Sequence, residues 1–537
     1  MRFVFVGPGR IVSSERSGVV TFENEARAQG LEDRSSATVL LNGDVRVRTQ
    51  EGTLESESIL ATYRSDEDIR FVSEGPSSSV SRSPETEDEV RVRSGLGMSA
   101  HLEGERWFVD RAEDFHAESF GADPFRVDAA TVTNVDVDRR TLEASGDISY
   151  QSLWGEVRSA DALVRGEDSI VLQGTEEVPV ILDLAPEGLA LANRTQEAAG
   201  IRTGFVRAAT LELRRSNFRA EGRVESELET PEGVWAFDAD VLRVQRAPLG
   251  AMPDPDLGPI TDPIAEVDDD GPNELRVEAD FVREARFEGV DGRARFQAKR
   301  MVVEGVVLQS EDDAAEENED LSLDEQRPVR VRAIGDVDIV AESLGPLPNP
   351  VIARWTLQAG SARFLRGPID PDGRPGTPMN LTADQVELCR YEAEGRLAEL
   401  SSKRVEIDAP LGAEPTVDGG LRETGEDGAP VEAAQRLEPR GASLVAKGDV
   451  ALSFRSTPGE EPLKARNGDT LVILDGERGR MLAEKGKRVR VTGRLPGDEV
   501  PYTLTATTLW FTQKDLRAND PEIRFARSFS LRQFGGV

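Results

Sequence analysis

Apolar and polar residues alternate along most of this chain. Short alternating segments lie at residues 39–48, 68–73, 203–214, 329–340 and 488–492. A period of two is typical of β-strands with one apolar face. Gly, Pro, Asn and Asp separate these segments, and the longer period of amphipathic helices is scarce. The pattern therefore predicts an all-β fold made of many short strands.

A Gly-Asp pair followed by a β-branched residue opens several of these strands. Copies lie at residues 43–45, 146–148, 335–337 and 448–450, and a degenerate copy lies at 220–224. Gly accepts the positive φ of a bulge or tight bend, and Asp can hydrogen-bond local backbone amides. We interpret the pairs as repeated bends, not as metal or sugar ligands. Their uneven spacing argues against a solenoid of short exact repeats.

A second recurring unit consists of Ala, a polar residue and a further alternating stretch. It occurs at residues 160–164, 239–244, 279–282, 298–303 and 383–388, with a weaker copy at 504–511. Between residues 146 and 182 the two units follow one another in order, with turns between strands. This order predicts a strand–turn–strand meander, and thus a stacked or folded-over β structure.

Polar, low-complexity stretches interrupt the strands. Residues 75–89, 247–273, 310–328, 367–378 and 410–439 are rich in Gly, Pro, Ser or acidic residues. Such stretches bury too little apolar surface to offset the entropy of ordering, so they predict loops and disordered inserts. The predicted organisation is an N-terminal β domain (1–246), a linker (247–273) and a C-terminal β domain (274–537) with acidic loops near 310–328 and 410–439.

Charge narrows the choice of partner. The chain has 537 residues, with 65 Lys or Arg against 100 Asp or Glu, for a formal net charge of -35. Most of such a surface repels nucleic-acid phosphates and anionic lipid headgroups, although local basic patches remain compatible with it. The sequence therefore predicts no nucleic-acid partner. The low aromatic content of 5% suits thin β layers better than one thick core.

Catalytic and metal-binding signatures are poorly represented. The two histidines, His101 and His116, are interpreted as surface residues, and Cys389 as a small buried hydrophobe on a strand. The acidic runs at 268–270 and 311–313 lack the alternate spacing of a calcium loop. No phosphate-binding Gly-rich loop or nucleophile motif occurs. We expect no catalytic residue, no metal and no cofactor, and hence a protein that is not an enzyme.

Two features bear on the compartment. No apolar run approaches the length of a transmembrane helix, and the apolar stretch at residues 3–6 is too short for a signal-peptide core. Either the chain is cytosolic or residue 1 is not the natural start, and we favour the second interpretation.

The apolar face of the predicted N-terminal strands defines the candidate site. Its residues would form either a closed core, which is the default, or an open aliphatic groove for acyl chains, in which each buried methylene contributes about 0.8 kcal/mol. The candidate residues are Val45, Val47, Leu54, Ile59, Ile148, Tyr150, Leu163, Ile170, Leu172 and Val180.

The order of these units resembles a known family. Residues 146–148, 159–164 and 168–174 look like the OstA-like domain of periplasmic lipopolysaccharide-transport proteins. Residues 43–71 resemble the same unit, and residues 448–450 with 463–465 suggest another. The resemblance is best over residues 37–184, patchy over 203–408 and moderate from 441 onward.

The resemblance implies a fold and a role. The implied fold is an elongated series of V-shaped antiparallel β-jellyroll units stacked end to end, here with acidic disordered inserts. The implied function is non-enzymatic: the inner face carries acyl chains of lipopolysaccharide toward the outer membrane, in the periplasm or cell envelope. The implied partners are lipopolysaccharide or another acylated lipid, and other β-jellyroll transport proteins that dock through edge strands. The greater length, the acidity and the inserts depart from the family pattern.

Two alternatives remain. One is a structural or adhesive β-solenoid of the cell envelope with a sealed core, which predicts no groove. The other is a carbohydrate-active enzyme on a β-helix, which needs convergent carboxylates and aromatic platforms. The five tryptophans, which could supply such platforms, are spread along the chain: Trp107, Trp154, Trp235, Trp355 and Trp510.

Overall fold

A computed structural model describes most of the chain. The described residues are 2–525 apart from 13–17, 31–36, 50–51, 66–67, 83–88, 104–105, 121–124, 137–140, 153, 167–168, 176, 185–202, 215–216, 231–232, 249–272, 290–291, 309–328, 345–350, 367–378, 394–395, 410–442, 456–460, 475–477, 484, 495–499 and 512–515. The predicted linker and acidic loops therefore lie almost wholly outside the described residues.

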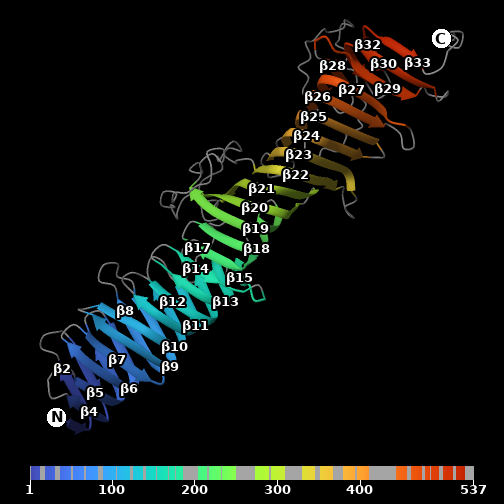
Figure 1. The fold of residues 1–537 in the computed structure, drawn as a ribbon. Helices are drawn as coiled ribbons and strands as arrows, with labels where there is room; N and C mark the ends of the chain where they lie inside the picture. Colours follow the sequence, from blue (N-terminus) through green and yellow to red (C-terminus); the bar gives the residue numbers. More distant parts are fainter. Residues whose placement is uncertain are drawn as a thin grey trace, which may run out of the picture. The chain divides into compact units, whose positions relative to one another are not determined.

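The described part of the chain is all β, as predicted, and its regular elements are antiparallel strands without helices. The chain divides into two compact units. Unit 1 comprises residues 1–231, 240–275 and 308–315, and unit 2 comprises residues 232–239, 276–307 and 316–537. The division thus runs through β19 (Gly233–Pro248) and β20 (Asn273–Glu288). Within each unit, consecutive long strands pair antiparallel and lie next to one another, as β9 to β13 do in unit 1 and β22 to β27 in unit 2 (Figure 1).

The remaining strands of unit 1 are β1 (Arg2–Val6), β2 (Gly9–Val12), β3 (Val19–Phe22), β4 (Glu25–Gly30), β5 (Ala37–Arg48), β6 (Gly52–Ser65), β7 (Asp68–Glu74), β8 (Ser77–Arg82), β9 (Glu89–Glu103), β10 (Arg106–Phe120), β11 (Phe125–Asp136), β12 (Thr141–Ser152), β13 (Gly155–Arg165), β14 (Ile170–Gln173), β15 (Val180–Leu184), β16 (Thr203–Ala208), β17 (Thr210–Leu213) and β18 (Asn217–Thr230).

The remaining strands of unit 2 are β21 (Gly292–Leu308), β22 (Val329–Leu344), β23 (Val351–Arg366), β24 (Met379–Ala393), β25 (Arg396–Ala409), β26 (Ser443–Arg455), β27 (Leu463–Leu474), β28 (Arg478–Ala483), β29 (Val489–Arg494), β30 (Pro501–Ala506), β31 (Thr508–Phe511), β32 (Leu516–Asn519) and β33 (Glu522–Phe525).

Long strands are bent near their middle. At some positions in the sheet, two short strands lie end to end in the place of one long strand. In unit 1, β7 pairs with one half of β6 and β8 with the other, and β9 then pairs with both short strands. The same arrangement recurs between β13 and β18. β14 and β15 each pair with one half of β13, and β17 and β16 each pair with one half of β18. Each unit therefore consists of two half-sheets joined by the bends. In unit 1 we call them half-sheet A, which contains β7, β14 and β17, and half-sheet B, which contains β8, β15 and β16.

The Gly-Asp pairs form the bends, as the sequence predicts. In the copies at Gly43, Gly146, Gly335 and Gly448 the glycine has φ between 76° and 83°, and the following Asp also has positive φ. Each copy inserts one extra residue: Asn42 pairs with Ser58 but Val45 with Ser56, so β5 takes three steps where β6 takes two. The same shift recurs on β12, β22 and β26. These are β-bulges.

The Ser-rich stretch at 75–89 differs from its predicted loop. Residues 77–82 form β8, which pairs with β6 and β9 and directs Ser77, Ser79 and Ser81 inward, where all three are buried. The composition suggested a loop because serine is rarely buried. A strand forms because both neighbouring strands supply backbone partners, so the hydrogen-bonding capacity of its backbone is used in the ladder.

Candidate functional site

The inner face of unit 1 carries two continuous rows of side chains, one on each half-sheet. The row on half-sheet A crosses eleven strand segments in register: Leu41, Ile59, Ser73, Met98, Ala112, Val132, Ala144, Leu163, Leu172, Leu211 and Ala220. All are at most 5% exposed. At about 4.8 Å per strand, ten steps extend over roughly 48 Å.

Half-sheet B carries the matching row. It comprises Val47, Leu54, Ser79, Val92, Ala117, Val127, Tyr150, Val157, Leu182, Val206 and Ser226, all at most 3% exposed. The side chains are small or aliphatic apart from Tyr150, whose ring lies 6.3 Å from that of Phe125. Most side chains of the two rows are apolar, so this interior offers few partners to a polar group that enters it.

The structure brings the sequence-predicted residues into this interior. Ile59, Leu163 and Leu172 lie in the row of half-sheet A, and Val47, Leu54 and Tyr150 in that of half-sheet B. Val45, Ile148 and Val180 are buried on half-sheet B beside its row. Ile170 is only partly buried, because it lies at the far end of β14 from the bend, opposite Arg165.

Sequence reasoning missed the other members of the two rows. Alternation in residues 90–135 would have identified Val92, Ala112, Ala117, Val127 and Val132. Neither β10 nor β11 carries a Gly-Asp pair, so sequence reasoning did not recognise their bends. β10 has a positive φ at Asp114 without a glycine directly before it, and the register of β11 shifts between Asp128 and Thr131.

Side chains from the two half-sheets meet inside unit 1. The Arg165 guanidinium of half-sheet A lies 3.8 Å from the ring centroid of Phe125 on half-sheet B, a cation–π contact. Trp154 lies in the turn between the half-sheet B ends of β12 and β13. Its Nε1 donates a hydrogen bond of 2.6 Å to the carbonyl of Arg214, which follows β17 of half-sheet A. Its ring also packs edge-on against Phe218 at 5.1 Å. These contacts hold the two half-sheets together at the strand ends, away from the bends.

Unit 2 repeats the arrangement. Its inner row on one half-sheet comprises Phe296, Ile339, Leu357, Cys389, Leu400, Leu452, Ala465, Val491 and Leu504, all at most 5% exposed. Phe296 meets Phe364 of the other half-sheet edge-on at 5.9 Å. Cys389 is buried on β24, as predicted, and burial raises the pKa of its thiol to about 12.

The two histidines are partly exposed residues of β9 and β10, each beside a carboxylate. His101 is 2.6 Å from Asp110, and His116 is 2.6 Å from Asp128. Both histidines are partly exposed, with side chains 27% and 20% accessible. No group of three or more His, Cys, Asp or Glu residues in the described part of the chain is arranged to hold a metal ion. No helix among the described residues is long and apolar enough to cross a bilayer.

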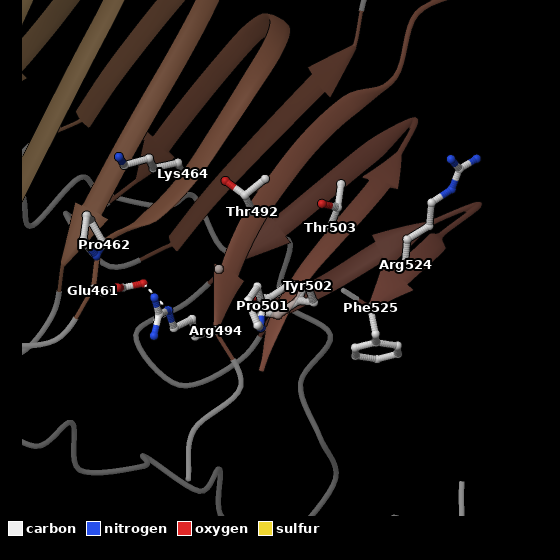
Figure 2. Close-up of a pocket in the computed structure, with 11 residues that line it drawn as sticks. Glu461, Pro462, Lys464, Thr492, Arg494, Pro501, Tyr502, Thr503, Arg524 and Phe525 are labelled. Carbon is white, nitrogen blue, oxygen red and sulfur yellow. Dashed lines mark ion pairs between the residues drawn. The ribbon is translucent and has the colours of Figure 1, made fainter. Parts of the chain in front are cut away.

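One concavity lies on the outer face of unit 2, not in the interior. It has a volume of about 600 Å³ and is lined by residues of β27, β29, β30 and β33, among them Lys464, Thr492, Thr503 and Arg524 (Figure 2). The sequence analysis proposed none of these residues as a binding site, although Lys464 and Thr492 fall in segments that it identified as β units.

Comparison with known proteins adds no assignment: neither a protein-family model nor a curated protein matches this chain.

Proposed function

We propose that this protein is a non-enzymatic, lipid-binding β scaffold of the cell envelope, whose interior takes up the acyl chains of lipopolysaccharide or another acylated lipid. The observation that carries the proposal is the pair of continuous buried rows on the two half-sheets of unit 1, whose members are apolar apart from three serines and Tyr150. Half-sheets joined by recurring bulges are what the resemblance to the OstA-like family, with its V-shaped jellyroll, leads us to expect. In that arrangement the acyl chains would lie between the two rows.

Energetics favour an acyl ligand over a polar one. Each methylene transferred from water into this interior contributes about 0.8 kcal/mol, so a chain of ten buried methylenes would contribute on the order of 8 kcal/mol before ordering costs. The half-sheets must part to admit it, at the expense of contacts such as Arg165 with Phe125. The strand ends opposite the bends are therefore the proposed entrance.

The second candidate function is a sealed structural scaffold. It is favoured by the contacts that join the half-sheets, namely Arg165 with Phe125 and Trp154 with Phe218. In this case the interior is only a core, and no lipid enters it.

Edge strands supply the proposed protein partners. Among the described residues β1 pairs only with β4, β2 only with β3, β32 only with β31 and β33 only with β30. Phe5, Val6 and Val12 near one edge, and Ile523 near the other, are more than half exposed. An unpaired strand edge templates pairing with another strand, so these edges are the proposed docking sites for similar β proteins of a transport bridge in the periplasm.

Photo-crosslinking tests the interior directly. A photo-reactive residue at Leu163, which is 0% exposed, is compared with one at Val164, which is 50% exposed on the opposite face of the same strand. Each protein is incubated with lipopolysaccharide and with a phosphatidylglycerol vesicle. Crosslinking to lipopolysaccharide at residue 163 but not at 164 supports the lipid-binding function. No lipid adduct at 163 in a folded protein rejects it and favours the sealed scaffold.

A further inference from the structure

The outer face of β27, β29, β30 and β33 is basic in an acidic chain. Residues 485–494 include five Lys or Arg side chains and no Asp or Glu, whereas the whole chain has 100 acidic residues against 65 basic ones. Such a local reversal of charge needs a specific explanation, because random placement in this chain would favour carboxylates.

The strand register places Arg490 of this segment with cations of β27 and β33 in two neighbouring rows. One row consists of Lys464, Thr492, Thr503 and Arg524, and the other of Arg466, Arg490, Thr505 and Glu522. Both rows lie on the outer face, because the residues that alternate with them on β27, β29 and β30 (Ala465, Val491 and Leu504) are at most 5% exposed. We call this surface the cationic face.

Arg466 and Arg490 are the two residues of the cationic face that point most directly to a bound anion. They lie directly opposite each other on β27 and β29, and both are exposed. Like charges at opposed cross-strand positions destabilise a sheet. Among the described residues neither guanidinium forms an ion pair, whereas Arg488 nearby pairs with both Asp520 and Glu522. An anion placed between Arg466 and Arg490 would remove the repulsion.

The first row lines the concavity of about 600 Å³, in which Thr492 and Thr503 lie between Lys464 and Arg524 (Figure 2). The one carboxylate in the lining, Glu461, is held by Arg494 at 2.6 Å. Arg524 is also hydrogen-bonded, at 2.6 Å, to Glu522 of its own strand. The lining therefore keeps an excess of positive charge. Its volume falls within the range of small-molecule sites and exceeds what a bare phosphate would fill.

We propose that the cationic face binds a phosphorylated monosaccharide. Guanidinium and ammonium groups donate charge-assisted hydrogen bonds to phosphate oxygens. Threonine hydroxyls both donate and accept, which suits the hydroxyl groups of a sugar. This site lies on the outer surface, so it goes beyond the proposed acyl-binding function and does not depend on it.

Calorimetric titration of the full chain with glucose 1-phosphate tests the proposal, with glucose and inorganic phosphate as the comparison ligands. We expect saturable binding of glucose 1-phosphate that is tighter than binding of either comparison ligand. Arg490→Gln should weaken the binding of glucose 1-phosphate roughly tenfold, the loss expected for one charged hydrogen bond. Arg46→Gln makes the same change of charge in unit 1, where Arg46 lies 3.3 Å from Glu55, and should leave binding unchanged.

Stability separates a binding role from a structural one. Since Arg490→Gln removes a like-charge contact, the melting temperature of the ligand-free variant should be equal to or above that of the parent protein. A lower melting temperature together with weaker binding would assign Arg490 a structural role and overturn the proposal. So would the absence of saturable binding, or equal weakening by Arg46→Gln. Equal affinities for inorganic phosphate and glucose 1-phosphate would overturn the recognition of a sugar.

Discussion

At the residue scale, the glycine of each Gly-Asp pair is required both by its backbone angle and by a close neighbour. A Cβ on Gly335 would lie 2.9 Å from Cδ of Lys299, and a Cβ on Gly448 would lie 2.9 Å from Cδ of Lys403. The sequence predicts local backbone amides as partners of the Asp carboxylates. In these two copies the structure places a lysine of the preceding strand there, with Lys299 2.7 Å from Asp336 and Lys403 2.8 Å from Asp449. The lysine stem thus covers the glycine while its ammonium meets the Asp.

Gly448→Ala should therefore destabilise unit 2 by about 1–3 kcal/mol, because alanine at φ +77° is strained and its methyl group collides with the Lys403 stem. Gly486→Ala is the matched control: its φ is +83°, but no atom lies within 4 Å of the added methyl group. It should show the smaller cost of backbone strain alone. Urea unfolding midpoints compare the two variants, and equal losses would show that the lysine contact contributes nothing.

Cys389 should be chemically inert in the folded protein. Burial raises the pKa of its thiol to about 12, so almost no thiolate, the reactive form, exists at pH 8. A disulfide-exchange reagent should leave the native chain unmodified at pH 8 and should label its single cysteine only after unfolding. Gln358→Cys, at an exposed position on the neighbouring strand, provides a reactive control. Rapid labelling of native Cys389 would mean that the interior of unit 2 opens to solvent.

At the element scale, a buried carboxylate joins three neighbouring strands. Glu342 on β22 is 8% exposed and lies between Arg293 on β21, at 2.6 Å, and Arg354 on β23, at 2.8 Å. Burial by itself would raise the pKa of Glu342, but hydrogen bonds from Arg293 and Arg354 and their positive charges lower it on balance. The charged form of Glu342 is therefore the one that stabilises the fold.

Glu342→Gln should lower the free energy of unfolding by about 1–2 kcal/mol at pH 7, because two charge-assisted hydrogen bonds are weakened. A lowered folded-state pKa stabilises the protein above the unfolded-state pKa, and this contribution is lost as the pH falls through the folded-state value. The difference between variant and parent should thus shrink below about pH 4. Thermal melts from pH 7 to pH 3 measure it. Glu399→Gln, which breaks a looser exposed pair with Arg390 at 3.8 Å, should cost less than about 0.5 kcal/mol.

The sequence predicts those bends that contain a Gly-Asp pair, but not those whose positive φ angles depend on the register of neighbouring strands. The pairs Gly43-Asp44 and Gly448-Asp449 could be recognised because few other residues accept two successive positive φ angles. Phe281 and Gln385 also have positive φ, although bulky residues disfavour it. The register of the neighbouring strands holds them there, and no local signal reveals that register. For the same reason the sequence did not predict β8. Its serines are buried because β6 and β9 provide backbone partners at both of its edges.

At the scale of the whole molecule, alternation predicts which residues face inward but not whether the interior opens. Nine of the ten predicted groove residues are buried, yet an open groove and a sealed core would share that pattern. The difference lies in contacts between distant strand ends, such as Arg165 with Phe125, which depend on how the two half-sheets approach each other. Sequence periodicity carries no information on the separation of the two half-sheets, because it describes each strand separately.

The division into two units leads to a prediction about cooperativity. Leu172→Asp places a charge at a fully buried position between Leu163 and Leu211, at a cost well above that of a surface change. In proteins built by stacking similar elements, each element draws its stability from its neighbours. Hydrogen exchange should therefore accelerate in β13, β14 and β17, whereas β22 to β26 of unit 2 should keep the parent rates. The surface substitution Val164→Asp is the control and should change neither region. Acceleration throughout both units would show that the chain unfolds as one cooperative structure, and would contradict the independence of the two units.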